Sequence, residues 1–131
     1  MKITVIGGGP GGLYFSILTK KAMPHCTIDV YERNKPEDSF GFGVVFSDET
    51  LGEFLKRDMQ SYELIRSNFA YWDNIVVARD GQNVHAAGNG FCGCSRKTLL
   101  KLLHQRCREE GVDLHFEQNI DNLEAFKDSD I

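Results

Sequence analysis

Residues 3–32 read ITVIGGGPGGLYFSILTKKAMPHCTIDVYE, and this stretch decides the fold. It opens with a short apolar run over 3–6 that glycines close, which is typical of a buried strand. Over residues 12–21 the apolar side chains recur at helical spacing. Residues 27–31 form a second run of β-branched and aromatic residues. The order strand, glycine turn, helix and strand predicts a βαβ unit over residues 1–33.

A glycine pattern lies at the first turn of this unit. Gly7, Gly9 and Gly12 form GxGxxG directly after the first strand and at the start of the helix. The pattern alone is a weak signal, but Glu32 closes the second strand 20 residues after Gly12. Dinucleotide-binding folds place an acidic residue at about this distance. Turn, helix and acidic residue together predict a Rossmann-like nucleotide site.

Each residue of the pattern has a physical role. Gly7 permits a tight turn, Gly9 lets the backbone approach a diphosphate, and Gly12 lets the helix pack against the strand. The helix N-terminus offers unpaired N–H groups and a partial positive charge, and Pro10 is tolerated there because its missing N–H falls at a turn or in the first helical position. Glu32 is expected to accept hydrogen bonds from ribose hydroxyls and to repel the extra phosphate of NADP. The site therefore favours FAD or NAD.

The residues after Glu32 favour FAD over NAD. A doubly wound NAD domain continues soon with another helix and strand, whereas the next candidate parallel strand here begins at Val112. Residues 34–95 are therefore an expected insertion with room to cover the second half of a longer cofactor. Its expected parts are a loop over 34–46, a helix capped by Ser47 and running to about Arg57, a helix through Tyr62 and Ile65, and an antiparallel hairpin at Asp80-Gly81.

Residues 96–131 are predicted to return the chain to the parallel sheet. Ser95 is expected to cap a helix that Gly111 ends, and Val112 to Phe116 alternate as a third strand. The chain stops at a first apolar residue after a polar turn, as though another strand were beginning and the sequence were cut short. The predicted fold class is α/β, a Rossmann-like FAD-binding domain over 1–131 whose parallel sheet is interrupted by the insertion.

Arg96 and Lys97 begin a predicted helix, where the macrodipole disfavours cations. Two explanations stay open for Arg96. One is a second contact to the cofactor diphosphate, and the other is a surface pair with a nearby carboxylate.

Charge and composition exclude several classes of protein. The net charge is −4 with both signs interspersed, so neither nucleic acid nor an anionic membrane is an expected partner. No stretch resembles a signal peptide or a membrane span, which leads us to expect a cytoplasmic protein. The four cysteines and four histidines show no spacing typical of a metal site or a catalytic dyad. We expect no metal and treat these side chains as reduced thiols and as surface or packing residues.

Four segments carry a family resemblance: KITVIGGGPGGLYF, DVYERN, GFGVVFSDETL and GFCGCSRKTLL. They resemble the class A flavoprotein aromatic hydroxylases of the para-hydroxybenzoate hydroxylase type. Within that type they look most like the hydroxylases of aromatic CoA thioesters, such as salicylyl-CoA and 2-aminobenzoyl-CoA. The resemblance implies a monooxygenase that uses FAD, NADH or NADPH, and oxygen to hydroxylate an aromatic ring, with the hard chemistry done by the cofactor.

The resemblance also implies roles for individual residues. The positions that would contact FAD are, for the diphosphate, Gly7, Gly9, Pro10, Gly11 and Gly12; for the adenosine, Glu32 and Arg33; and for the flavin side, Gly43, Val44 and Arg96. Para-hydroxybenzoate hydroxylase has arginines where this chain has Phe42 and Val44, so only backbone contacts are expected there. No catalytic side chain can be named, because the family's later motifs lie beyond Ile131. We expect the 131 residues alone to be inactive.

Two other functions stay open at this stage. Related folds serve as FAD-dependent reductases or dehydrogenases that do not use oxygen. Alternatively, the chain is a non-catalytic nucleotide-binding module. The substrate, the choice between NADH and NADPH, and the oligomeric state are not predicted.

Overall fold

The computed structural model describes the backbone of residues 1–131 and every side chain except that of Asn89. The chain divides into two compact units. The sheet unit consists of residues 1–40 and 97–131, and the hairpin unit consists of residues 41–96.

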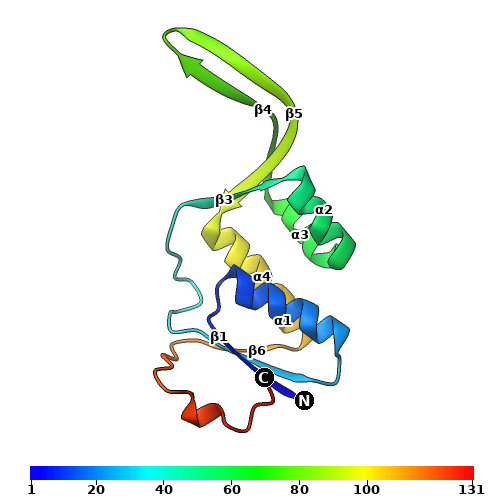
Figure 1. The fold of residues 1–131 in the computed structure, drawn as a ribbon, viewed down its shortest axis with the longest axis vertical. Coiled ribbons are helices and arrows are strands. Elements are labelled where there is room, and N and C mark those ends of the chain that lie inside the picture. Colours follow the sequence, from blue (N-terminus) through cyan, green and yellow to red (C-terminus); the bar gives the residue numbers. More distant parts are fainter. The chain divides into compact units, whose positions relative to one another are not determined.

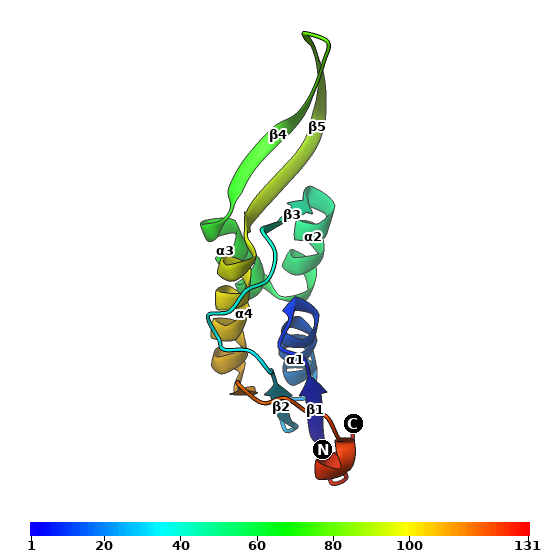
Figure 2. The same ribbon diagram turned by 90° about the vertical axis from the view of Figure 1, so that its left-hand side faces the viewer.

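The sheet unit is built on three parallel strands (Figure 1). β1 (Lys2–Ile6) and β2 (Thr27–Tyr31) are joined by the helix α1 (Pro10–Ala22), and β2 pairs on its other side with β6 (Asp113–His115). The predicted βαβ unit and third parallel strand are therefore confirmed. α4 (Arg96–Glu110) leads into β6, and α1 and α4 lie side by side over one face of the sheet (Figure 2).

The core of this unit lies between the sheet and the two helices. Ile3 and Ile28 are neighbours in the sheet register and both are buried, as is Ile17 of α1. Their alternation with more exposed residues is the period-2 pattern of a strand with one covered face. In α4 the buried Cys107 lies against α1, where its Sγ is 3.5 Å from the carbonyl oxygen of Leu13.

The last residues run along the free edge of β1. The N–H of Thr4 donates to the carbonyl oxygen of Ile131 at 2.8 Å, and the N–H of Asp130 donates to the carbonyl oxygen of Lys2 at 2.8 Å. Just before them, the short 3₁₀ helix η1 (Leu123–Phe126) places the Phe126 ring 4.9 Å from that of Tyr31. The carboxyl-terminal residues thus hydrogen-bond to the free edge of β1, but they form no strand, so the expected start of a strand there is not observed.

The hairpin unit contains an antiparallel sheet in the order β3-β5-β4 (Figure 1). β4 (Ala70–Arg79) and β5 (Gln82–Ser95) turn at Asp80 and Gly81, which both have positive φ, 50° and 78°. This is the predicted DG hairpin. Two consecutive turn residues with positive φ give the turn a backbone twist that matches the twist of the flanking strands. The prediction of a loop as far as residue 46 is wrong, because Gly43–Ser47 form β3 and pair with the end of β5.

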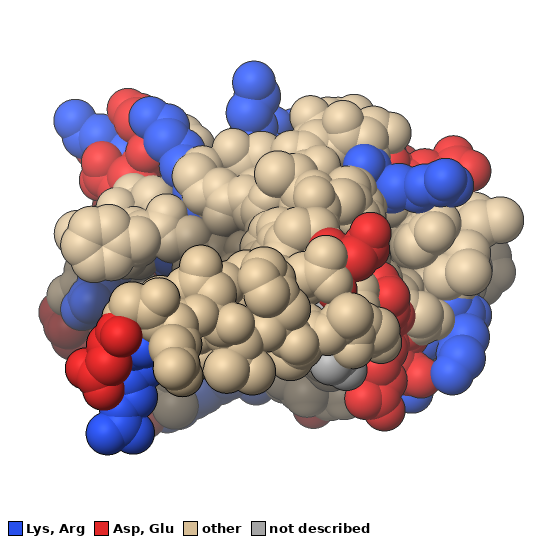
Figure 3. Space-filling view, turned by 90° about the horizontal axis from the view of Figure 1, so that it is seen from above, with Lys and Arg blue, Asp and Glu red and all other residues tan. Residues whose placement is uncertain are grey.

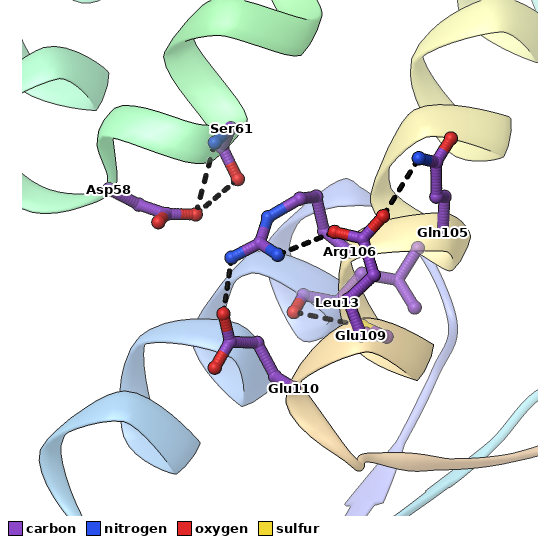
Figure 4. Close-up of polar contacts among 8 residues, drawn as sticks. Leu13, Asp58, Ser61, Gln105, Arg106, Glu109 and Glu110 are labelled. Carbon is purple, nitrogen blue, oxygen red and sulfur yellow. Dashed lines mark hydrogen bonds and ion pairs between the residues drawn. The ribbon is translucent and has the colours of Figure 1, made fainter.

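Two capped helices follow β3. α2 (Asp48–Arg57) begins after Ser47, whose Oγ accepts a hydrogen bond from the N–H of Thr50 at 3.3 Å, so the predicted cap is confirmed. α3 (Met59–Asn68) begins after Asp58, whose carboxylate accepts bonds from the N–H and hydroxyl of Ser61 (Figure 4). Both helices turn apolar side chains into the unit, since Leu51 and Ile65 are buried.

Gly52 offers a test of local helix stability in the hairpin unit. It lies inside α2, and a Cβ added there would meet no atom within 4 Å. We expect Gly52→Ala to raise the free energy of unfolding by about 0.5–1 kcal/mol, because alanine loses less backbone entropy on folding. Gly81→Ala is the matched control and should destabilise, since Gly81 has a φ of +78°. Urea denaturation measures the change in the free energy of unfolding for each variant. Equal changes in the two variants would contradict the explanation by backbone entropy and φ.

The surface carries both signs of charge. Acidic and basic side chains are intermixed around the rim of the face in Figure 3, and uncharged residues cover its centre. Of the helices that the structure describes, none is both long enough and apolar enough to cross a bilayer.

Candidate functional site

The glycine turn after β1 is the first part of the candidate site. Gly7 has a φ of +113°, a conformation that favours glycine, and its N–H donates to the carbonyl oxygen of Tyr31 at 2.8 Å. Gly12 lies against this turn, because a Cβ added to it would overlap the carbonyl oxygen of Gly7 and lie 3.3 Å from Cγ1 of Val5. These contacts give Gly7 and Gly12 the turn and packing roles predicted from the sequence.

The N-terminus of α1 is the second part. The helix begins at Pro10, and among the described residues no side chain caps it. The first N–H groups of a helix have no partner within the helix, so those of Gly11 and Gly12 are available to an anion. A Cβ added at Gly9 or Gly11 would meet no described atom within 4 Å. Donors, helix dipole and open space together suit a diphosphate.

Glu32 is the third part, one residue beyond the end of β2. Its Oε2 accepts a hydrogen bond from the N–H of Gly8 at 2.8 Å. Its Oε1 accepts bonds from the N–H and the side-chain amide of Asn34, at 2.9 and 2.6 Å. Oε2 keeps a lone pair that can accept from a ligand hydroxyl. Burial raises the pKa of Glu32, but the bonds from Asn34 and Gly8 outweigh it, so the net pKa is lowered and the carboxylate is ionised at neutral pH.

Gly8 is a functional position that the sequence reasoning missed. It is buried, and a Cβ added there would lie 2.8 Å from Cβ of Glu32. The glycine therefore allows Glu32 to lie directly on the turn, and its N–H orients the carboxylate. The third consecutive glycine in GGG was the available signal, since GxGxxG itself leaves this position open.

A cavity of about 390 Å³ opens beside Glu32, within the size range of small-molecule sites. It lies at the carboxyl ends of the parallel strands, where such sheets bind ligands. Arg33, the predicted adenosine contact, is one of its lining residues. The sequence reasoning missed the polar residues Asn34, Gln118 and Asn119, which also line it. Their position just after β2 and β6 was the signal.

The other predicted site residues lie together in the hairpin unit. Gly43 and Val44 pair in β3 with Ser95 and Cys94 of β5. A Cβ added at Gly43 would lie 2.9 Å from the carbonyl oxygen of Cys94, so strand pairing already requires a glycine there. Arg96 follows Ser95, and its side chain lies near Gly41. Of the two explanations for Arg96, an ion pair with a carboxylate is not found among the described residues.

Arg106 of α4 is a buried cation with a structural role. Its guanidinium is 2% exposed and forms ion pairs with Glu109, at 2.7 Å, and with Glu110 (Figure 4). Among the described residues no three His, Cys, Asp or Glu side chains gather as a metal ion would require.

His104 predicts a pH dependence of stability. Its side chain is 5% exposed, and burial, reinforced by Arg108, lowers the pKa of the imidazole, while Glu32 opposes the shift. The unfolded chain therefore binds this proton at a higher pH than the folded chain does. We expect stability to fall as the pH drops from about 7 through about 6.5, by at most roughly 1.4 kcal/mol per pH unit.

Urea denaturation between pH 5 and 8 tests this prediction. We expect the free energy of unfolding to depend less steeply on pH in His104→Leu than in the parent chain. His25→Leu, at an exposed position, is the matched control and should leave the slope unchanged. Equal slopes in all three proteins would show that His104 does not carry the effect.

Comparison with known proteins gives three relatives, while no protein-family model matches the chain. A salicyloyl-CoA 5-hydroxylase of Streptomyces sp is 41% identical over 131 residues, which are 100% of this chain and 25% of that protein. A 3-hydroxy-4-methyl-anthranilyl-(aryl-carrier protein) 5-monooxygenase of Streptosporangium sibiricum is 31% identical over 86% of this chain and 32% of its own length. A protodeoxyviolaceinate monooxygenase of Chromobacterium violaceum is 31% identical over 89% of this chain and 32% of its own length.

Solved structures share the fold. A p-nitrophenol 4-monooxygenase of Pseudomonas putida matches with a TM-score of 0.79 at 14% identity, over 92% of this chain and 32% of that chain. A 2-methyl-3-hydroxypyridine-5-carboxylic acid oxygenase matches with a TM-score of 0.76 at 18% identity, over 88% of this chain and 31% of that chain. The chain thus spans between a quarter and a third of the length of each of these five proteins.

Proposed function

We propose that this chain, which is similar over its whole length to the N-terminal part of flavin-dependent aromatic monooxygenases, is the portion of such an enzyme that binds the ADP half of FAD. The observation that carries the proposal is the carboxylate of Glu32. It is ionised, fixed by Gly8 and Asn34, and faces the cavity beside the glycine turn. A ribose hydroxyl that donates to it would replace water at low cost, because the acceptor is already oriented.

The residues present fit FAD. The open space at Gly9 and Gly11, with the free N–H groups at the start of α1, suits the diphosphate. Arg33 would lie along the adenosine, and backbone groups of Gly43 and Val44 with the side chain of Arg96 would serve the flavin side. When bound, FAD supplies the redox chemistry, and the residues of this chain bind and orient it. The 131 residues would thus form the N-terminal portion of an FAD-binding domain.

For the whole enzyme we propose hydroxylation of an aromatic substrate with oxygen and NADH or NADPH. The support is the similarity to three monooxygenases of aromatic compounds. Two of their names specify a thioester-linked aromatic acid, on coenzyme A or on a carrier protein. An aromatic acyl thioester is therefore the proposed substrate class. Oxygen consumption that depends on an added aromatic CoA thioester tests this in the full-length enzyme.

FAD binding by the chain itself tests the cofactor proposal. We expect the purified chain to bind FAD, as measured by quenching of flavin fluorescence. Glu32→Ala should weaken binding by about 10-fold to 100-fold, because it removes charge-assisted bonds to the ribose. Glu53→Ala, on exposed α2, is the matched control and should bind normally.

Two outcomes would count against the cofactor proposal. Equal affinity in the parent chain and Glu32→Ala would mean that FAD does not use this carboxylate. Binding of NAD as tight as that of FAD would mean that the site selects the shared ADP group only.

A further inference from the structure

A second cavity in the sheet unit lies along one face of α4. Lys97, Lys101, His104 and Arg108 follow one another at intervals of four, three and four residues, which places them on the same side of the helix. Together with residues 36–37 they line a cavity of about 230 Å³. The residues that hold the proposed FAD site do not line it.

His104 is a buried polar group that lines this cavity. Its side chain is 5% exposed, and its ring meets the edge of the Phe116 ring at a centroid distance of 5.0 Å. Among the described residues no hydrogen bond to a ring nitrogen is found. A neutral imidazole holds one N–H donor and one acceptor, and buried polar groups normally have partners. The ring nitrogens of His104 are not among the fully buried atoms that lack a partner, so water can reach them from the cavity, and a ligand there would take the place of that water.

The charges around the cavity favour an anion. Lys97, Lys101 and Arg108 are exposed and form no ion pairs among the described residues, whereas Lys56 and Arg57 of α2 both pair with Glu53. The carboxylate of Glu37 also lines the cavity, which leaves an excess of two positive charges. Arginine and lysine together with an imidazole N–H form the donor set that binds phosphate oxygens.

The size of the cavity limits the ligand. At about 230 Å³ it is smaller than the roughly 300–1,000 Å³ that a whole cofactor or drug-sized ligand requires. It therefore suits one anionic group of a larger molecule. Its lining residues 36–37 closely follow Arg33 and Asn34 in the chain, which line the proposed adenosine cavity.

We propose that this cavity binds a phosphate monoester carried on an adenosine ribose. NADPH carries this group and NADH lacks it, and coenzyme A carries it and dephospho-CoA lacks it. Geometry and charge favour an anion in this cavity. The choice of these carriers rests on the proposed function, which requires a nicotinamide donor and a thioester substrate. In this arrangement Lys97, Lys101 and Arg108 contact the phosphate oxygens, and His104 donates its N–H.

The test compares dissociation constants within each pair of ligands by calorimetry, using the 131-residue chain. We expect coenzyme A, NADPH or both to bind roughly 10-fold tighter than the partner that lacks the phosphate. The preference should disappear in the double variant Lys101→Gln, Arg108→Gln. It should persist in Lys56→Gln, which removes an exposed lysine from α2 of the hairpin unit. If the preference appears in only one of the two pairs, that pair identifies the molecule that carries the phosphate.

A second readout is the NMR signal of the His104 ring. Titration with the preferred ligand should shift it, whereas the ligand without the phosphate should not. Equal dissociation constants within both pairs would overturn the proposal, and so would a preference that survives in the double variant. Glu32→Ala separates this proposal from the FAD proposal, because it should lose FAD and keep the phosphate preference.

Discussion

Gly12→Ala is expected to abolish FAD binding and to destabilise the sheet unit by about 3 kcal/mol. The added Cβ would overlap the carbonyl oxygen of Gly7, which is backbone in a tight turn and cannot rotate away as a side chain can. Val5 blocks movement of the helix towards the strand, since its Cγ1 would be 3.3 Å from the new atom. Relief requires α1 to shift, and overpacking of this kind typically costs 1–3 kcal/mol or more.

The measurement is urea denaturation of the chain, followed by FAD titration of whatever remains folded. Gly11→Ala is the matched control, because a Cβ added one residue earlier meets no atom within 4 Å. That variant should keep the parent stability, although its new methyl group occupies part of the space proposed for the diphosphate, so stability is the property that it controls. If Gly12→Ala proved as stable as Gly11→Ala, the packing role of Gly12 would be wrong.

Gly8→Ala is expected to weaken FAD binding by roughly 10-fold to 100-fold, with a smaller effect on folding. Its Cβ would lie 2.8 Å from Cβ and 3.2 Å from Cγ of Glu32. Cβ of Glu32 is fixed by the backbone, so the turn at Gly8 and the residue after β2 have to move apart. This movement breaks the bond from the N–H of Gly8 and displaces the carboxylate from the cavity. The loss in affinity thus arises from Glu32, although the substitution is at another residue.

A double-mutant cycle isolates this coupling. The variant with both Gly8→Ala and Glu32→Ala should bind FAD as weakly as Glu32→Ala alone, because the carboxylate that Gly8 positions is already absent. Additive losses would show that Gly8 contacts the cofactor directly and does not position Glu32. Circular dichroism of each variant confirms that the helices remain.

The local elements of this fold were largely predictable. The strand over 27–31, the cap at Ser47 and the turn at Asp80-Gly81 are where the sequence placed them. In each case the signal is local, because apolar periodicity, a side-chain cap and positive φ depend on neighbouring residues. β3 was mispredicted as a loop because its strand character comes from pairing with the far end of β5, which no local pattern reports.

The candidate site divides in the same way. Gly7, Gly12 and Glu32 were recognisable from sequence, because their spacing is set by one strand, one turn and one helix, whose lengths are constrained. The oriented state of Glu32 was not, since it depends on donors from two separate backbone segments.

The sequence by itself determined the glycine turn, the helix and the acidic residue at the end of the second strand, because short-range sterics and periodicity suffice for these elements. Only the tertiary structure decided that Gly8 must be glycine, that Gln118 and Asn119 line the cavity beside Glu32, and that α4 places His104 and three cations around a second cavity. Such juxtapositions join residues that are distant in the chain, and which of them meet is decided by packing.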